Sequence, residues 1–370
     1  MEVFFNNTLY KGVKASWSST VKNPKLFDDL DSFINNNKND YIICFYSYDL
    51  KNNIEDLYSK NKDNMKFPDI HCFGPDEIHN NYLIGKEKKI NQEIEFQPDI
   101  SKEEYLKNIL KIKEHIQKGD FYEANYCYQW ISKVEHLNSK LIFENLMDLT
   151  NPPYGFYADL EKHHVISASP ELFIKKRGNK LYSSPIKGTQ KRDLDPIKDQ
   201  LLKKQLKDSL KDQAENNMIV DLVRNDLSKI ALKNTVKMEE LREVYTFKNI
   251  HQMISTISCE ISENEKISNI LKASFPMGSM TGAPKIKVMQ IMEDYEVSKR
   301  GLYSGSVGYF TPEGNFDFNV IIRSIVYNAK RKYASFMVGG AITAKSIPEL
   351  EYQECLIKAK AMFQVLGHAQ

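Results

Sequence analysis

The sequence has little that points to a disulfide framework, a cysteine-based metal site or a membrane span. It holds five cysteines, and no two of them form a C-x-x-C pair: Cys44, Cys72, Cys127, Cys259 and Cys355. An odd number of widely spaced cysteines is atypical of zinc sites and of disulfide-bonded secreted domains, so we expect free thiols. No uninterrupted apolar run approaches the roughly 18 residues that a transmembrane helix requires.

A net charge of either sign is also nearly absent. The chain has 51 Lys and Arg residues against 49 Asp and Glu residues, a formal net charge of +2. This balance gives no electrostatic reason to expect binding to nucleic acid or to an anionic membrane. The opening residues, MEVFFNNTLYKG, have no basic segment followed by a long apolar run, so the sequence predicts no signal peptide and a cytoplasmic location.

What is present is the composition of an ordinary globular protein, with 41% apolar and 27% charged residues in a chain of 370. That length favours one large domain or two intertwined ones. We expect residues 1–98 to form a short N-terminal region that contributes to the same fold, and residues 99–370 to form the main domain.

Local patterns predict a mixture of helices and strands. Ser101 and Glu104 form a capping box, apolar residues then recur at helical spacing, and Gly119 is the expected end of that helix. Further expected elements are strands over 41–50, 121–134, 163–178 and 180–188, a turn over 151–160, and helices over 141–149, from Asp195 to about Arg224, and over 349–366. This order lacks the strict βαβ alternation of a dinucleotide-binding sheet.

Eight segments from about residue 101 onward carry the most specific signal. In order they are GDFYEANYCYQ, SASPELF, PIKGTQKR, KDQAENNMIVDLVRNDL, FPMGSMTGAPK, RGLYSGSVGYF, FNVIIRS and ELEYQECLIKAKA. Together they resemble the chorismate-binding enzymes, a family that includes anthranilate, isochorismate, salicylate and aminodeoxychorismate synthases. The resemblance implies an α+β fold with a two-layer β-sandwich core and surrounding helices that close over one deep site. It also makes residues 99–370 the chorismate-binding catalytic domain.

Two carboxylate pairs lie in these segments. Asp212 and Glu215, and likewise Glu351 and Glu354, are three residues apart, which places each pair on one face of a helix. An isolated pair of this kind is more typical of a solvated acidic stripe. Four converging carboxylates, however, would repel one another without a hard cation between them, and Mg2+ prefers such oxygen ligands. The resemblance implies that Glu215 and Glu354 contact the metal, which would hold the ring carboxylate of chorismate.

Cationic and amide groups are expected to bind the other anionic edge of this dicarboxylate. Arg323 can bind a carboxylate through two hydrogen bonds, and Lys358 shares a helical face with Glu354. The pair Gly339 and Gly340 would let backbone N–H groups approach an anion closely. The resemblance adds three further residues to the chorismate pocket: Thr189, Thr281 and Tyr303.

The lysine of the PIKGT segment favours one reaction within the family. Anthranilate synthases usually have a small residue where this chain has Lys187, whereas aminodeoxychorismate synthases use that lysine as a nucleophile. A buried amine is expected to have a lowered pKa, so it could attack ring carbon C2 while the C4 hydroxyl leaves. The resemblance assigns the acid/base role to Glu171, whose pKa burial would raise. Otherwise Lys187 would be an inert loop lysine and Glu171 a salt-bridged strand residue.

Several positions depart from the family pattern. Glu123 stands where the water-adding members have lysine and the aminating members usually have glutamine. Gln252, rather than His251, aligns with a histidine that the family links to pyruvate elimination. Met337 and Ala341 replace glycines near the expected carboxylate contacts. Glu123 therefore argues against the water-adding enzymes, and Gln252 against release of pyruvate.

No cysteine lies in the G-x-C-x-G turn of the family's glutamine amidotransferases, so the nitrogen must come from elsewhere. The expected partner is a separate amidotransferase subunit (component II) that supplies ammonia. The expected activity is conversion of chorismate to 4-amino-4-deoxychorismate, for 4-aminobenzoate and folate synthesis. The alternatives are the reaction of anthranilate synthase component I and a non-catalytic, chorismate-binding regulatory role.

Overall fold

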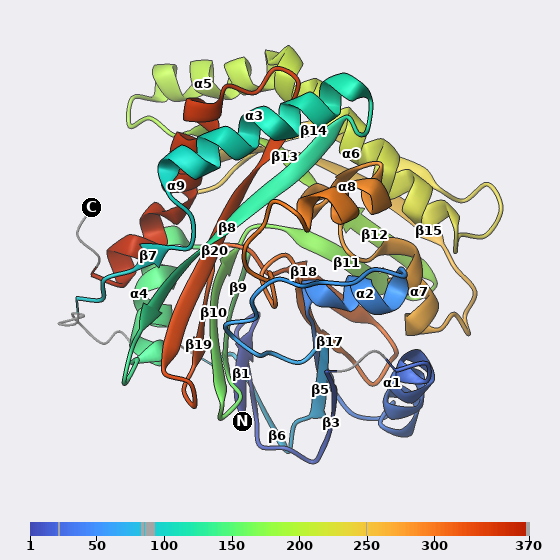
Figure 1. The fold of residues 1–370 in the computed structure, drawn as a ribbon. Coiled ribbons are helices and arrows are strands. Elements are labelled where there is room, and N and C mark those ends of the chain that lie inside the picture. Colours follow the sequence, from blue (N-terminus) through green and yellow to red (C-terminus); the bar gives the residue numbers. More distant parts are fainter. Residues whose placement is uncertain (21–22, 83–84, 86–92, 249, 368–370) are drawn as a thin grey trace.

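Two large antiparallel sheets form the centre of the computed structural model, which describes residues 1–20, 23–82, 85, 93–248 and 250–367 (Figure 1). The first sheet has the order β16-β8-β20-β19-β10-β9-β1-β2-β6, and β7 also pairs with β8. Its strands are β1 (Glu2–Phe5), β2 (Thr8–Lys11), β6 (Glu77–Asn80), β7 (Gln97–Pro98), β8 (Glu123–Lys133), β9 (Tyr154–Asp159), β10 (His163–Ser169), β16 (Gly282–Ala283), β19 (Ser324–Asn328) and β20 (Tyr333–Thr343).

The second sheet has the order β13-β15-β12-β11-β18-β17-β4-β5-β3, and β14 also pairs with β15. Its strands are β3 (Ala15–Ser19), β4 (Ile42–Tyr46), β5 (Ile70–Gly74), β11 (Leu172–Arg177), β12 (Lys180–Ser184), β13 (Ile186–Lys191), β14 (Lys237–Thr246), β15 (Ile250–Glu260), β17 (Ser306–Phe310) and β18 (Phe316–Val320). Strands from residues 1–98 therefore lie in both sheets.

The apolar faces of the two sheets meet in a shared core. Phe5 and Phe156 of the first sheet lie in one buried cluster with Phe45 and Val307 of the second. This packing of face against face is the two-layer β-sandwich that the sequence predicts. The antiparallel pairing also confirms that no dinucleotide-binding sheet is present in the described part of the chain.

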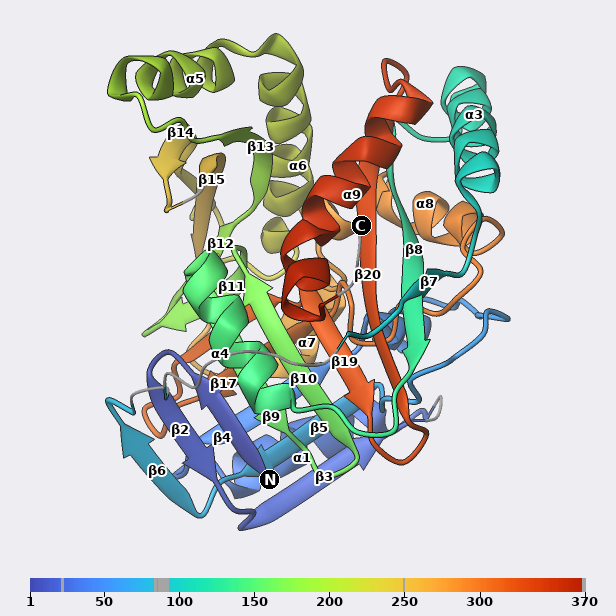
Figure 2. The same cartoon turned by 90° about the vertical axis from the view of Figure 1, so that its left-hand side faces the viewer.

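Helices cover the outer faces of both sheets (Figure 2). On the first sheet, Ile109, Phe143 and Phe363 bring three helices into one core cluster. On the second, Leu30 and Ile219 do the same for two others. The helices are α1 (Leu26–Asn36), α2 (Lys51–Ile54), α3 (Lys102–Lys118), α4 (Ser139–Thr150), α5 (Pro196–Asp208), α6 (Leu210–Ser228), α7 (Ile267–Ser274), α8 (Lys285–Met292) and α9 (Pro348–Val365), with short 3-10 turns η1 (Tyr48–Leu50) and η2 (Gly278–Met280).

The predicted limits of α3 are confirmed. The hydroxyl of Ser101 accepts a hydrogen bond from the backbone N–H of Glu104 at 3.1 Å. Gly119 ends the helix with a φ of 82°, which is unstrained only for a residue without a side chain. The strand expected over 121–134 and the helices over 141–149 and 349–366 are also present, with small shifts of their ends. The strand expected over 41–50 ends at Tyr46, before the 3-10 turn η1, and the strands expected over 163–178 and 180–188 are each divided in two, at residues 170–171 and at Pro185.

Two further local predictions were wrong. The expected long helix after Asp195 is interrupted at Ser209, whose extended backbone ends α5 and whose hydroxyl caps α6 by accepting the N–H of Asp212 at 3.3 Å. The expected turn over 151–160 contains β9, because pairing with β1 and β10 on both sides and the burial of Phe156 outweigh the presence of Gly155.

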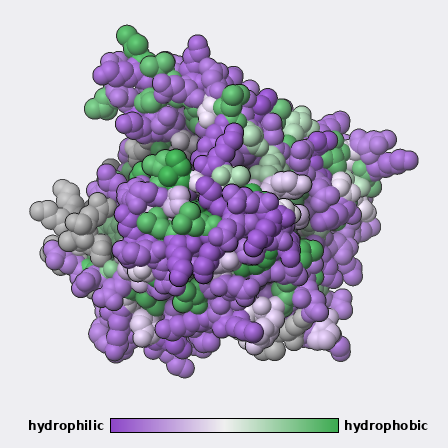
Figure 3. Space-filling model, turned by 45° about the horizontal axis from the view of Figure 1, so that its top comes forward, coloured by the Kyte–Doolittle hydropathy of each residue, from purple (hydrophilic) through white to green (hydrophobic). Residues whose placement is uncertain are grey.

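The face of the molecule drawn in Figure 3 is largely hydrophilic. In the view of Figure 3, apolar side chains form small separate groups among polar ones. Within the described residues, no helix is both long and apolar enough to cross a membrane.

Candidate active site

Lys187 and Glu123 come from different sheets and meet in a buried ion pair. Nζ of Lys187 lies 2.8 Å from Oε1 of Glu123, and only 11% and 1% of the two side chains are exposed. Burial by itself would lower the pKa of Lys187, but the charge and hydrogen bond of Glu123, with the charges of Glu215 and Glu171, raise it instead. The predicted lowered pKa of Lys187 is therefore wrong, because the buried amine faces carboxylates rather than an apolar wall.

Glu171 lies between β10 and β11 and is buried close to Lys187. Burial raises the pKa of its carboxyl to about 7, and a hydrogen bond from the Ser279 hydroxyl, with Lys187, opposes the rise. The Ser279 Oγ to Glu171 Oε1 distance is 2.6 Å. A carboxyl that is neutral at moderate pH can donate a proton, which is what the sequence predicts for Glu171.

The four predicted metal ligands share one neighbourhood but do not form a ready-made metal site. The charges of Asp212, Glu215, Glu351 and Glu354 all raise the pKa of Lys211, against the effect of its burial. Across the part of the chain that the structure describes, no group of three or more His, Cys, Asp or Glu side chains is placed to hold a metal ion. The carboxylates thus converge on a cationic side chain of the protein itself.

Three of the four carboxylates have a close partner of their own. Glu354 lies 2.7 Å from Lys358, Glu215 lies 3.8 Å from Lys211, and Asp212 accepts a 2.5 Å hydrogen bond from the capping residue Ser209. Burial raises the pKa of Glu215 to about 7. Burial likewise raises the pKa of Glu351. The charge of Lys358 lowers the pKa of Glu354.

Several residues predicted to bind the substrate fall into two groups, one around Arg323 and one around Lys358. Arg323 lies near Glu171 and Tyr303, and burial lowers the pKa of its guanidinium. Its φ of 50° is uncommon for a residue other than glycine, asparagine or aspartate, so the surrounding fold must hold it. Lys358 donates a 2.9 Å hydrogen bond to the carbonyl oxygen of Gly339, and a Cβ on Gly340 would lie 3.5 Å from Oε2 of Glu351.

Other predicted binding residues make structural contacts within the chain. The hydroxyl of Thr281 donates to the carbonyl oxygen of Met277 at 3.0 Å. Tyr303 is buried, and Thr189 is exposed on β13. Gly339 is needed for packing, because a Cβ there would lie 2.5 Å from the sulfur of Cys127 on β8.

The position that the family links to pyruvate elimination falls on β15, where Gln252 and His251 lie on opposite faces of the strand. Gln252 is paired with Thr189 of β13 and is buried, whereas His251 lies 3.0 Å from Asp199 through Nε2. Gln252 thus lies across from the strand that carries Lys187. Met337 is buried in the core, and Ala341 is paired with Asn125 of β8.

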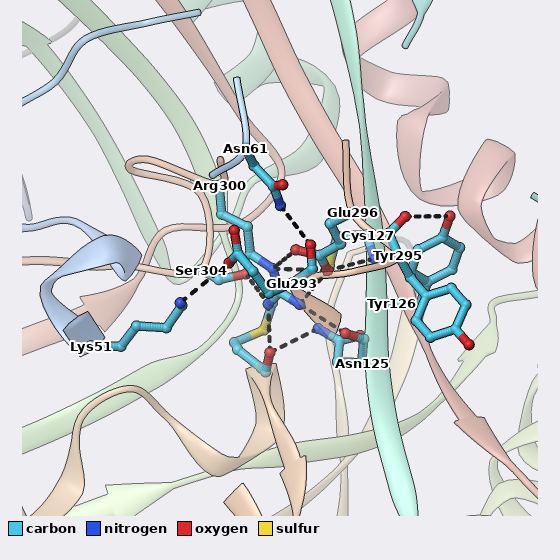
Figure 4. Close-up of polar contacts among 11 residues, drawn as sticks. Lys51, Asn61, Asn125, Tyr126, Cys127, Glu293, Tyr295, Glu296, Arg300 and Ser304 are labelled. Atoms are coloured by element: carbon cyan, nitrogen blue, oxygen red, sulfur yellow. Dashed lines mark hydrogen bonds and ion pairs between the residues drawn. The ribbon is translucent and has the colours of Figure 1, made fainter. Parts of the chain in front are cut away.

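A buried ion pair holds the start of β8, the strand that carries Glu123 (Figure 4). Arg300 and Glu296 form it at 2.6 Å. The guanidinium of Arg300 donates to the carbonyl oxygen of Asn125 at 2.8 Å, and Glu296 accepts the N–H of Cys127 at 3.1 Å. These two hydrogen bonds satisfy backbone groups of Asn125 and Cys127, which follow the short pairing of β8 with β16. They therefore fix the start of the strand that carries Glu123.

Sequence reasoning did not identify three contributions to the site: the partnership of Glu123 with Lys187, the hydrogen bond of Ser279 to Glu171, and the position of Lys211 among the carboxylates. Ser279 and Lys211 both lie inside segments that resemble the family. Their polar character within those segments is the only signal that could have identified them.

Comparisons with known proteins identify the family of this chain. The family described as chorismate binding enzyme matches residues 7–364. The chain is 39% identical over 269 residues to a probable chloroplastic aminodeoxychorismate synthase of Oryza sativa, a stretch covering 72% of this chain and 30% of that protein. It is 34% identical over 272 residues to aminodeoxychorismate synthase component 1 of Escherichia coli, covering 74% and 59%. It is 33% identical to anthranilate synthase component 1 of Aquifex aeolicus, covering 74% and 54%.

Solved structures share the fold at low sequence identity. Anthranilate synthase component I of Streptococcus pneumoniae superimposes with a TM-score of 0.83 at 21% identity, over 98% of this chain and 92% of that one. Menaquinone-specific isochorismate synthase of Escherichia coli gives 0.80 at 17% identity, over 99% and 88%. The α+β sandwich is thus confirmed, and the match across nearly the whole sequence places the chain in the family of chorismate-binding enzymes.

Proposed function

We propose that this chain converts chorismate and ammonia to 4-amino-4-deoxychorismate, the reaction of aminodeoxychorismate synthase component I. The observation that carries the proposal is the buried amine of Lys187, which lies near the proton-donating Glu171. An inert loop lysine would point into solvent, whereas only 11% of the Lys187 side chain is exposed.

The proposed chemistry has two substitution steps. The uncharged amine of Lys187 bonds to ring carbon C2, the ring double bonds shift, and the C4 hydroxyl leaves as water with a proton from Glu171. Ammonia then bonds to C4, the double bonds shift back, and the lysine leaves as an amine. Covalent catalysis replaces one difficult displacement of hydroxide with two easier steps, and the enolpyruvyl group is retained.

Magnesium fits the donor set that we propose for it, since all four candidate ligands are carboxylates. Two of them, Glu215 and Glu351, have raised pKa values because of burial, so a nearby cation would stabilise their ionised forms. Glu215 and Glu354 would hold the metal, with Asp212 and Glu351 beside them. The ion would supply a positive charge that binds the ring carboxylate of chorismate.

Replacement of Lys211 by methionine tests this metal site. The variant removes an internal cation that competes for the carboxylates, so we expect Mg2+ to bind about threefold to fivefold more tightly at pH 8, a modest gain because Lys211 is half exposed. Isothermal titration without substrate measures it, with Lys207→Met as the matched exposed control and Glu215→Gln as the variant that should bind weakly. Weaker binding by Lys211→Met would contradict competition.

The ammonia source in this proposal is a separate glutamine amidotransferase subunit. All five cysteines of this chain are buried and free, so none is presented as an amidotransferase nucleophile would be. The chain spans between 30% and 59% of the length of the relatives compared above, so their full activities and partners enter here as proposals.

Product analysis separates this function from its nearest alternative. The chain is incubated with chorismate, Mg2+ and ammonium, and the product is identified by mass. A product that retains the enolpyruvyl group supports amination at C4, whereas release of pyruvate with a fluorescent aromatic product would identify anthranilate synthase. Gln252, rather than histidine, beside the strand of Lys187 favours the first outcome.

A further inference from the structure

Glu123 is held in place by backbone contacts on both sides. It pairs with Ala283 of β16 and with Thr343 of β20. The approach of β16 depends on Gly282, because a Cβ there would lie 2.1 Å from the carbonyl oxygen of Glu123. These contacts fix the backbone from which the Glu123 side chain extends to Lys187.

One oxygen of this carboxylate has no partner. Oε1 of Glu123 accepts the hydrogen bond from Lys187, whereas Oε2 is buried and has no hydrogen-bond donor among the described residues. A buried acceptor without a donor is unfavourable. Glu123 thus has an unused position at which it can hold a proton.

The charges around Lys187 make a proton acceptor necessary. Glu123 faces it from β8, Glu215 from α6 and Glu171 from the connection between β10 and β11, and all three favour the charged amine. Glu354 of α9 also interacts with it electrostatically. A charged amine has no lone pair, so the proton must leave before the amine can form a bond.

Among these carboxyl groups, only Glu123 is positioned to take that proton directly. Within the described part of the chain, it is the one acidic residue that lies within 4.0 Å of the Lys187 ammonium. Glu171 is occupied by the hydrogen bond from Ser279, and its pKa of about 7 suits a proton donor. The two carboxyl groups that flank the amine therefore suit opposite roles.

We propose that Glu123 is a catalytic base that takes the proton of Lys187 before the amine attacks and returns it when the lysine leaves. This role rests on the proposed function. The proton moves from Nζ to Glu123, and the amine bonds to C2 as water leaves with the Glu171 proton. Ammonia then bonds to C4, giving an ammonium product, and the released amine recovers its proton from Glu123. The product ammonium supplies the proton that Glu171 needs, so the sum is chorismate plus ammonia giving aminodeoxychorismate plus water.

Glu123→Gln tests this role, since glutamine keeps the shape and an acceptor oxygen but cannot take a proton. The enzyme is mixed with chorismate and Mg2+ without ammonium, and formation of the lysine adduct (enzyme plus chorismate minus water) is followed by rapid quench and intact mass. We expect Glu123→Gln to form the adduct about 100-fold more slowly at pH 7. The wild-type to variant ratio should fall about tenfold per pH unit above that, because Lys187 then loses its proton to solvent.

Matched variants separate proton transfer from a structural effect. Glu123→Asp keeps a carboxylate and should preserve the wild-type pH dependence at a lower rate. Glu239→Gln removes the carboxylate of a partly exposed pair, 3.0 Å from Lys180, and should leave the rate unchanged. A constant wild-type to Glu123→Gln ratio across pH would overturn the role of Glu123 alone. Absence of any adduct in the wild type would overturn the covalent route and the role of Glu123 with it.

Discussion

Replacement of Lys187 by alanine is expected to lower ammonium-dependent consumption of chorismate by about 10³-fold or more, the order of loss found when a nucleophile is removed. In the proposed reaction Lys187 supplies the amine that bonds to C2, and the groups whose charges act on it are carboxylates rather than a second amine. Steady-state rates with saturating chorismate, Mg2+ and ammonium measure the effect. Unchanged turnover would remove the covalent step.

The same substitution is also expected to lower stability, which must be separated from the chemistry. Glu123 would remain buried without its cation, and breaking a buried ion pair costs about 3–5 kcal/mol. The double variant Lys187→Met/Glu123→Gln removes both charges, so it should recover most of the free energy of unfolding in urea while remaining inactive. Recovery of activity together with stability would show that the single variant fails only because it unfolds.

The sequence predicts a lowered pKa for Lys187, whereas its surroundings in the structure raise the pKa. This difference shows that a motif does not specify the charges around a side chain. Its segment indicates the residue and its role, but the pKa of a buried amine depends on which groups face it. Glu123 comes from a strand 64 residues earlier in the chain, so only the tertiary structure places it 2.8 Å away. Sequence spacing similarly groups Asp212 with Glu215, yet Ser209 caps the helix and occupies an oxygen of Asp212.

The elements of the fold that could be predicted are those set by local signals. Ser101 and Gly119 end α3 as the capping pattern predicts. The strand at Phe156 could not be predicted in this way, because its pairing with β1 involves residues about 150 positions away and overrides the nearby glycine and prolines. No local pattern specifies the order of the strands in the two sheets. The resemblance implied only the general architecture, a two-layer β-sandwich.

The second large effect is expected at Glu171. Its carboxyl is protonated below its pKa of about 7 and ionised above it, and the proposed departure of water requires the protonated form. With saturating chorismate, the rate of adduct formation in the wild type should therefore fall about tenfold per pH unit above 7. Glu171→Gln cannot donate a proton and should reduce that rate by about 10²-fold to 10⁴-fold at pH 7.

Ser279→Ala is the matched test of this assignment, because it changes the pKa of Glu171 without removing the carboxyl group. The Ser279 hydroxyl stabilises the ionised form and lowers the pKa, so its loss should move the alkaline limit of the rate to higher pH. A limit that stayed in place, or moved to lower pH, would assign the titration to another group, such as Glu215.

The stability of Glu171→Gln should change in the opposite direction to its activity. Because the folded protein raises the pKa of Glu171 above its ordinary value, the stabilisation by the neutral carboxyl is fully present below that ordinary value and is lost as pH rises through about 7. Glutamine stays neutral at every pH. Urea unfolding should therefore give similar stabilities for the two proteins near pH 5 and an advantage for Glu171→Gln at pH 8, up to roughly 3 kcal/mol. An advantage independent of pH would mean that Glu171 is not the buried group that titrates.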